Sequence, residues 1–145
     1  LVDVAREAVR FCASRGIALL LNGPPEQVLA VGAAGLHLRS DELMKLDERP
    51  LDRRQWVAAS CHDEAQLQQA ARIGADFAVF GPVLRTATHP EARPLGWAAF
   101  GQSVEAAELP VYALGGLDES HLSEARHMGA QGIAAIRGFQ GRMAP

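Results

Sequence analysis

The chain has 145 residues, of which 48% are hydrophobic and 21% are charged, a size and composition suited to one globular domain with its own core. Its net charge is −3, and it has neither a run of lysine or arginine nor an apolar stretch near the roughly 20 residues of a membrane span. These features argue against a nucleic-acid partner and a membrane partner. Two cysteines without paired spacing, Cys12 and Cys61, favour a reducing, cytoplasmic setting.

Hydrophobic periodicity and glycine or proline breaks predict helices that alternate with short strands. From the N-terminus we expect a helix over 3–15, a strand over 17–21, a helix over 25–31 and a strand over 35–38. The middle of the chain continues with a helix from Ser40, a polar loop or broken helix over 46–55, a strand over 56–60 and a helix over 63–73. The last part has a strand over 76–80, a loop, a helix over 96–108, a strand over 111–114, a helix over 118–128 and a strand over 132–136. Cys12 falls on the apolar side of the first helix, so we expect it to be buried.

The strands are apolar throughout, which is typical of a parallel sheet covered by helices. A helix that ends in Gly-Ala shortly before a strand recurs at Gly32, Gly74 and Gly129. This repeat favours an α/β fold of the (βα)8 TIM-barrel type over an open doubly wound sheet, which stays as the alternative. Because a whole barrel needs at least about 200 residues, the chain is expected to supply about six βα units of one domain, residues 1–145, that lacks its N-terminal two units.

Barrels of this type bind ligands at the carboxyl ends of their strands, and the loops after the last two strands commonly hold a phosphate. Gly115-Gly116 and Arg137-Gly138 occupy those two places here. Glycines let backbone N–H groups approach an anion closely, so this spacing predicts a phosphate site. Two simpler readings stay open: the glycines only turn the chain, and Arg137 points outward to pair with a surface acid.

Other polar residues also follow predicted strands. Asp41 and Glu42 are candidate ligands for Mg²⁺, a cation that prefers carboxylates and substrate phosphates, although acids also suit the first turn of a helix. Thr86 and Thr88 stand beside His89 and either contact a ligand or cap a turn. His37 alternates with apolar residues inside a strand and is expected to be a hydrogen-bonded core histidine.

Five segments in this order resemble the superfamily of thiamine phosphate synthases and TenI-type thiazole tautomerases: IALLLNG, VGAAGLHL, VAASCHDEAQLQQAARIGADFAVFGPVLRTATHP, LPVYALGGL and GAQGIAAI. The resemblance runs from about Ile17 to Gly138 and implies a (βα)8 barrel. It also implies a cytoplasmic transferase that joins a pyrimidine diphosphate to a thiazole phosphate carboxylate and releases diphosphate with Mg²⁺. A segment reading PLGW resembles in particular a subgroup in which such a domain follows a Nudix hydrolase domain.

The resemblance implies a role for individual residues. A thiazole phosphate site would be formed by Thr86, Thr88, Gly115, Gly116, Ile136 and Arg137, and contacts to the pyrimidine diphosphate would come from Asn22 and Ser60. The positions at which this sequence differs from the family pattern fall mostly among the residues that would contact the diphosphate or its metal ion. Gly23 stands where the family has an aspartate metal ligand, Glu42 aligns with the second acidic ligand, and His89 replaces a lysine that binds diphosphate. Arg137 replaces a serine, and Pro82 stands where the tautomerases have their histidine.

Two functions therefore stay open. The first is a transferase of thiamine phosphate synthase type with a weakened metal site, for which Mg²⁺ is the candidate cofactor. The second is a non-catalytic module that binds a small phosphorylated heterocycle and serves an attached Nudix domain. A homo-oligomer is an alternative assembly to the attached domain. The carboxylates at Asp41 and Glu42 distinguish the two functions, because the transferase needs strong neutralisation of a leaving diphosphate.

Overall fold

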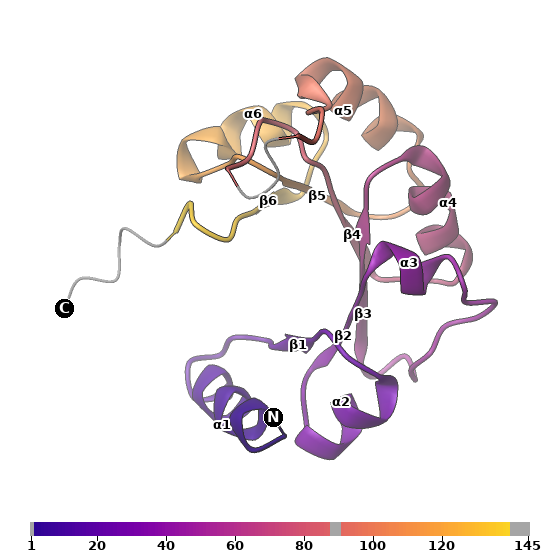
Figure 1. Ribbon diagram of the computed structural model, residues 1–145, viewed down its shortest axis with the longest axis vertical. Helices are drawn as coiled ribbons and strands as arrows, with labels where there is room; N and C mark the ends of the chain where they lie inside the picture. Colours follow the sequence, from indigo (N-terminus) through magenta and orange to yellow (C-terminus); the bar gives the residue numbers. More distant parts are fainter. Residues whose placement is uncertain (1, 88–90, 140–145) are drawn as a thin grey trace.

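Six parallel strands form one sheet in chain order, β1-β2-β3-β4-β5-β6, in a computed structural model that describes residues 2–87 and 91–139. The strands are β1 (Leu20–Leu21), β2 (Gly35–Leu38), β3 (Trp56–Cys61), β4 (Phe77–Phe80), β5 (Val111–Leu114) and β6 (Gly132–Ala134). Figure 1 shows that the sheet curls into a half-barrel. The prediction of consecutive βα units in a TIM-barrel-like fold is confirmed, and the open doubly wound sheet is excluded because every neighbouring pair of strands is consecutive in the chain.

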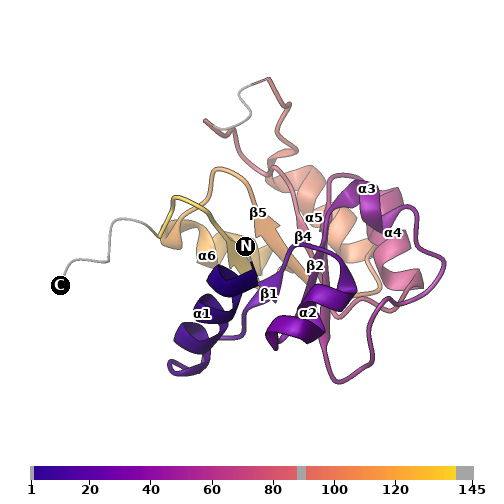
Figure 2. The same ribbon diagram turned by 60° about the horizontal axis from the view of Figure 1, so that its bottom comes forward.

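The helices follow the outer, convex side of this sheet (Figures 1 and 2). They are α1 (Val2–Ala13), α2 (Pro25–Val31), α3 (Ser40–Leu43), α4 (Glu64–Arg72), α5 (Gly96–Ala106), the 3₁₀ turn η1 (Glu119–His121) and α6 (Leu122–His127). Local signals explain several starts: Asp63 accepts a hydrogen bond from the Gln66 amide at the start of α4, and Asp118 accepts one from the Ser120 amide at η1. No helix in the described part of the chain is long and apolar enough to cross a membrane.

Side chains alternate between the two faces of the sheet. On the convex side, Leu36, Val57 and Phe80 are buried against the helices, and the Phe80 ring stacks on Phe100 of α5 at 5.7 Å between centroids. Each such side chain contributes about 1.5–3 kcal/mol to the free energy of folding. Alternation places the polar residues of the strands, among them His37 and Ser60, on the concave side.

The ends of the sheet depart from the prediction. β1 covers only Leu20–Leu21 of the expected strand, and Ile17 is 54% exposed because β1 is an edge strand that pairs only with β2. β6 ends at Ala134, and Ile136 is 75% exposed. The expectation that Cys12 is buried was wrong: α1 buries none of its residues completely, since among the helices it packs chiefly on α2, and Cys12 is only half-buried.

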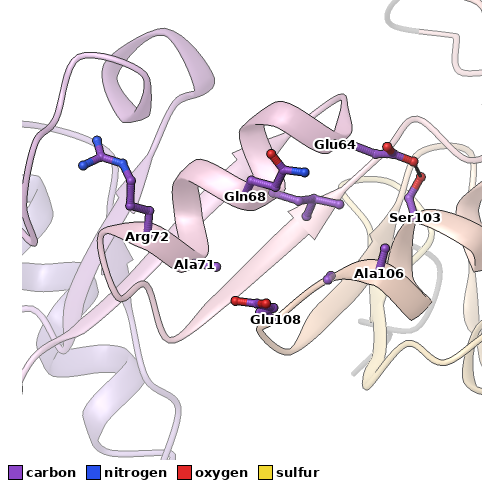
Figure 3. A pocket seen from close by; sticks show the side chains of 9 residues that line it. Glu64, Gln68, Ala71, Arg72, Ser103, Ala106 and Glu108 are labelled. Atoms are coloured by element: carbon purple, nitrogen blue, oxygen red, sulfur yellow. Dashed lines mark hydrogen bonds between the residues drawn. The ribbon is translucent and has the colours of Figure 1, made fainter.

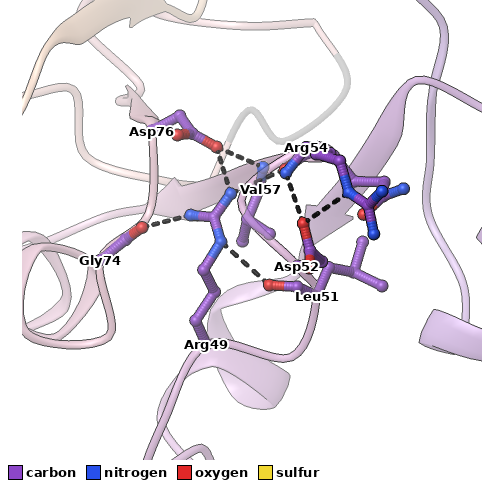
Figure 4. Close-up of polar contacts among 8 residues, drawn as sticks. Arg49, Leu51, Asp52, Arg54, Val57, Gly74 and Asp76 are labelled. Atoms are coloured by element: carbon purple, nitrogen blue, oxygen red, sulfur yellow. Dashed lines mark hydrogen bonds and ion pairs between the residues drawn. The ribbon is translucent and has the colours of Figure 1, made fainter.

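Arg49 connects the chain segments at the N-terminal ends of the strands, the ends away from the strands' carboxyl ends (Figure 4). Its guanidinium donates to three backbone carbonyl oxygens, those of Leu51, Gln55 and Gly74. It also pairs with Asp76, just before β4, at 2.7 Å between Nη2 and Oδ2. The same Asp76 oxygen accepts a hydrogen bond from the Val57 amide of β3. The polar stretch 46–55, expected as a loop or a broken helix, therefore carries the side chain that ties β3 to β4 at this end.

Candidate functional site

The carboxyl ends of all six strands lie at the same end of the sheet because every pair is parallel. We call this row of strand ends, with the loops that follow them, the rim. Its first half follows β1, β2 and β3 and carries Asn22, Arg39 and Ser60. Its second half follows β4, β5 and β6 and carries Thr86, Gly115, Gly116, Ile136 and Arg137. Thr88 and His89 lie outside the described residues, so the predictions for them stay predictions.

In the first half of the rim, Ser60 is hydrogen-bonded to His37. Its Oγ lies 2.8 Å from Nε2 of the histidine, and both side chains are partly buried. Burial lowers the pKa of His37, which favours the neutral ring near pH 7. The expectation of a hydrogen-bonded histidine is confirmed, and its partner is a residue of the candidate site. This contact joins β2 to β3 on the concave side, whereas Asn22 is exposed.

The acidic side chains after β2 are both engaged by Arg39. Both carboxylate oxygens of Asp41 accept hydrogen bonds from the Arg39 guanidinium, at 3.0 Å from Nε and 3.1 Å from Nη2. Glu42 accepts the Arg39 amide at 3.3 Å and so caps α3. Gly23, at the end of β1, supplies no carboxylate. Within the described ranges, no group of three or more histidine, cysteine, aspartate or glutamate side chains could hold a metal ion. The described residues therefore offer no unengaged carboxylate at this place for Mg²⁺, and the assignment of Asp41 and Glu42 as its ligands stays a prediction.

In the second half of the rim, glycines allow three loops to pack closely. Gly115 and Gly116 have φ values of 105° and 68°. A Cβ at Gly115 would lie 2.5 Å from the Pro82 Cα, and one at Gly116 would lie 2.6 Å from the Arg85 carbonyl oxygen. A Cβ at Gly138 would lie 2.9 Å from the Asp118 Cα. These glycines thus do more than turn the chain: they bring the loops after β4, β5 and β6 together.

Arg137 stands exposed beside this packed set of loops. No hydrogen bond or ion pair within residues 2–87 and 91–139 holds its guanidinium, so the structure offers no support for the alternative in which it pairs with a surface acid. Thr86 is half-buried in the loop after β4. The second half of the rim therefore combines closely packed backbone with an exposed positive charge.

Comparison with known proteins agrees with this architecture. The family model described as thiamine monophosphate synthase matches residues 1–139. The chain belongs to this family. A thiamine-phosphate synthase of Prochlorococcus marinus (strain MIT 9313) is 36% identical over 91% of this chain, but the match covers only 38% of that relative. A putative thiamine-phosphate synthase 2 of Aquifex aeolicus is 32% identical over 96% of this chain and 75% of the relative.

A solved structure shares the family fold. Thiamine phosphate pyrophosphorylase from Pyrococcus furiosus superposes with a TM-score of 0.72 at 21% identity, over 93% of this chain and 64% of that chain. At this identity the likeness establishes the fold alone. The chain thus spans about two fifths of the Prochlorococcus relative's length and under two thirds of the Pyrococcus chain.

Two rim contacts of this synthase-family chain escaped prediction. His62, directly after β3, places Nδ1 2.7 Å from the Gly81 carbonyl oxygen and so links the ends of β3 and β4. The His37–Ser60 contact joins residues 23 apart in sequence. Neither pair has a local sequence signal, because parallel neighbours meet only after an intervening helix.

A hollow of about 420 Å³ lies between α4 and α5, on the helical side of the sheet (Figure 3). Glu64 at the start of α4 accepts a hydrogen bond from Ser103 of α5 at 3.2 Å, and Arg72 and Glu108 lie farther along. The hollow is bounded by two neighbouring helices of the family barrel. It lies apart from the rim and includes none of the predicted site residues.

Proposed function

We propose that this chain forms most of the barrel of a transferase that joins a pyrimidine diphosphate to a thiazole phosphate and releases diphosphate. Membership of the thiamine monophosphate synthase family supports the proposal. The relatives reported above are described as synthases, which favours the transferase over a non-catalytic binding module. Thiamine-phosphate synthases act on small phosphorylated substrates, and we assign that substrate class to this rim.

The observation that carries the proposal is the second half of the rim. Glycines allow three loops to pack closely there. The exposed Arg137 adds a permanent positive charge and a planar set of N–H donors that suits phosphate oxygens. We assign the thiazole phosphate to Gly115, Gly116, Ile136 and Arg137, together with Thr86 and Thr88. His89 is assigned to the diphosphate that leaves.

The first half of the rim is assigned to the pyrimidine diphosphate. Ser60 would contact the pyrimidine, and its hydroxyl is oriented by the neutral ring of His37. Asn22 would contact the diphosphate. When the bond between the pyrimidine methylene carbon and the diphosphate oxygen breaks, positive charge develops on the pyrimidine and negative charge on the leaving group. Preorganised polar groups lower the barrier of such a step because they need not reorganise as the charge forms.

We further propose that the domain comprises the whole chain and that two additional βα units, supplied from its N-terminal side, complete the barrel. β1 and β6 are the two edges of the sheet, and the solved relative extends beyond the matched part. An attached Nudix domain, or a second copy of the chain, is the associated partner in this proposal. A cytoplasmic setting suits the two free thiols, Cys12 and Cys61.

The test is formation of thiamine phosphate by the intact protein from pyrimidine diphosphate and thiazole phosphate carboxylate, with each substrate omitted in turn. We expect turnover, and we expect Ser60→Ala to lower it about tenfold, as loss of one hydrogen bond would. Ser123→Ala, an exposed serine on α6, is the matched control and should retain the wild-type rate. Thiazole phosphate binding without any product would favour the non-catalytic module instead.

A further inference from the structure

Arg39 lies at the centre of the first half of the rim. It follows the last residue of β2, Leu38, which pairs in register with Ala59 of β3, so Arg39 is level with Ser60. On the other side, Leu21 of β1 is level with Leu36, which places Asn22 and Gly23 one strand away. The arginine therefore stands between the residues assigned above to the pyrimidine diphosphate.

The guanidinium of Arg39 is hydrogen-bonded to Asp41, but not all of its N–H donors have a partner among the described residues. Asp41 occupies the side formed by Nε and Nη2, while Nη1 has no partner within residues 2–87 and 91–139. The Arg39 side chain is 61% exposed, so its free edge is open to solvent. Because an arginine presents five N–H donors in a rigid fork, one carboxylate on one edge leaves room for an anion on another.

The carboxylates that could have held a metal are engaged in this arrangement. Asp41 pairs with Arg39 and has Lys45 at 4.0 Å, and Glu42 caps the first turn of α3. A cation that bound Asp41 would compete with a bidentate arginine for the same carboxylate. Two protein cations thus pair with the Asp41 carboxylate, and the neutral backbone amide of Arg39 occupies Glu42, so positive charge already stands at this place without a metal ion.

We propose that Arg39, positioned by Asp41, binds the diphosphate group of the substrate in place of a magnesium ion held by the protein. This inference rests on the proposed function, in which diphosphate is the leaving group. Arg39 supplies permanent positive charge and N–H donors to the phosphate oxygens, and Asp41 fixes the guanidinium through two hydrogen bonds that leave Nη1 for the ligand. No covalent step beyond the proposed transfer is added.

The test measures binding of inorganic diphosphate to the intact protein by titration calorimetry in buffer that contains EDTA. We expect binding that persists in EDTA and that falls about tenfold or more in Arg39→Gln, since a charge-assisted hydrogen bond is lost. Asp41→Asn should weaken binding less, because the arginine is kept and only its orientation is freed. Titration of the protein alone with Mn²⁺, followed by electron paramagnetic resonance, should show no site that is lost in Asp41→Asn.

Arg54→Gln is the matched control, because Arg54 forms a similar exposed pair with an aspartate two residues away, Asp52, at the opposite end of the strands. It should bind diphosphate like the wild type. The proposal is overturned if the wild type does not bind diphosphate, if EDTA abolishes binding, or if Arg39→Gln binds as tightly as Arg54→Gln. A Mn²⁺ site that depends on Asp41 would overturn it as well.

These outcomes are separable from failure of the proposed function. Diphosphate binding that depends on Arg39 in a protein that forms no thiamine phosphate would sustain the arginine site and remove the transferase. Turnover that requires Mg²⁺ and is unaffected by Arg39→Gln would sustain the transferase and remove the arginine site.

Discussion

The two ends of the parallel strands use arginine in opposite ways. At the N-terminal end, the Arg49 side chain is 10% exposed and donates to three carbonyl oxygens and to Asp76. At the rim, Arg137 is exposed and has no ion pair within the described part of the chain, and Arg39 has a free edge. The same functional group therefore serves folding where its donors are used internally and is available for a ligand where they are not.

This contrast follows from the barrel architecture. Chain connections at the N-terminal end only have to be held together, so burying a fully paired charge there restricts no binding surface. Loops at the carboxyl ends of the strands converge on one place, so exposed polar groups there can reach the same ligand. If this division holds, substitutions at one end should alter stability and substitutions at the other should alter binding.

The largest effect should come from Arg49→Ala. It removes one partner of a largely buried ion pair and leaves Asp76 and several carbonyl groups short of a donor, so we expect a loss of about 3–5 kcal/mol in the free energy of unfolding. Urea unfolding followed by circular dichroism measures this loss. Diphosphate and thiazole phosphate affinities should be unchanged at temperatures where the variant is folded.

Arg54→Ala is the control within the same loop, since the Arg54 side chain is 84% exposed and, among the residues that the structure describes, pairs only with Asp52. Its unfolding midpoint should match that of the wild type. Arg49→Lys, which keeps the charge but not the fork that reaches several carbonyls, provides a milder variant and should lie between the two. Equal midpoints for Arg49→Ala and Arg54→Ala would show that the Arg49 network does not stabilise this end of the sheet.

The sequence predicted the topology of the strands better than the contacts between residues far apart in the chain. Apolar strands that alternate with helices led to the parallel half-barrel, and parallel topology then placed Asn22, Ser60 and Arg137 on one rim. Contacts between distant residues were out of reach: Arg49 meets Asp76 across 27 residues, and His37 meets Ser60 across 23. Exposure at the sheet edges was also missed, as at Ile17 and Ile136, because apolar runs do not reveal which strands lack a neighbour.

The sequence also did not predict that the acids after β2 are hydrogen-bonded to Arg39. Asp41 and Glu42 have the residue types and the position of metal ligands, but the side chain of Arg39 and its backbone amide occupy them. A sequence pattern identifies donor atoms and does not show whether neighbouring cations have already taken them. The close packing of the loops in the second half of the rim was more predictable, because glycines act through local backbone shape, whereas the phosphate site assigned to these loops stays a prediction.

A smaller effect, on binding rather than stability, is expected from Arg137→Ala. Losing a charge-assisted hydrogen bond worth about 1.5–3 kcal/mol should weaken thiazole phosphate about tenfold to a hundredfold in a calorimetric titration. The unfolding midpoint should not change, because the side chain is exposed and unpaired within the described residues. Arg126→Ala, an exposed arginine on α6, alters the net charge equally and should bind normally. If both variants bind thiazole phosphate equally well, Arg137 does not contribute to the site, and the glycines would be its remaining phosphate-binding groups.

The smallest effect concerns His37, which lies between the two ends on the concave side of the sheet. Burial holds the pKa of His37 below the ordinary value of 6.5, so in the folded protein the ring resists protonation. Below about pH 6.5 the unfolded chain binds a proton that the folded chain does not, and stability is lost progressively as the pH falls toward the lowered pKa.

His37→Gln keeps a hydrogen-bonding side chain that does not titrate, so the difference in unfolding free energy between pH 7 and pH 5.5 should be smaller in this variant than in the wild type. His127→Gln, at an exposed histidine of α6, should keep the wild-type difference. If His37→Gln and His127→Gln respond alike to acid, burial of His37 does not contribute to the pH dependence of folding.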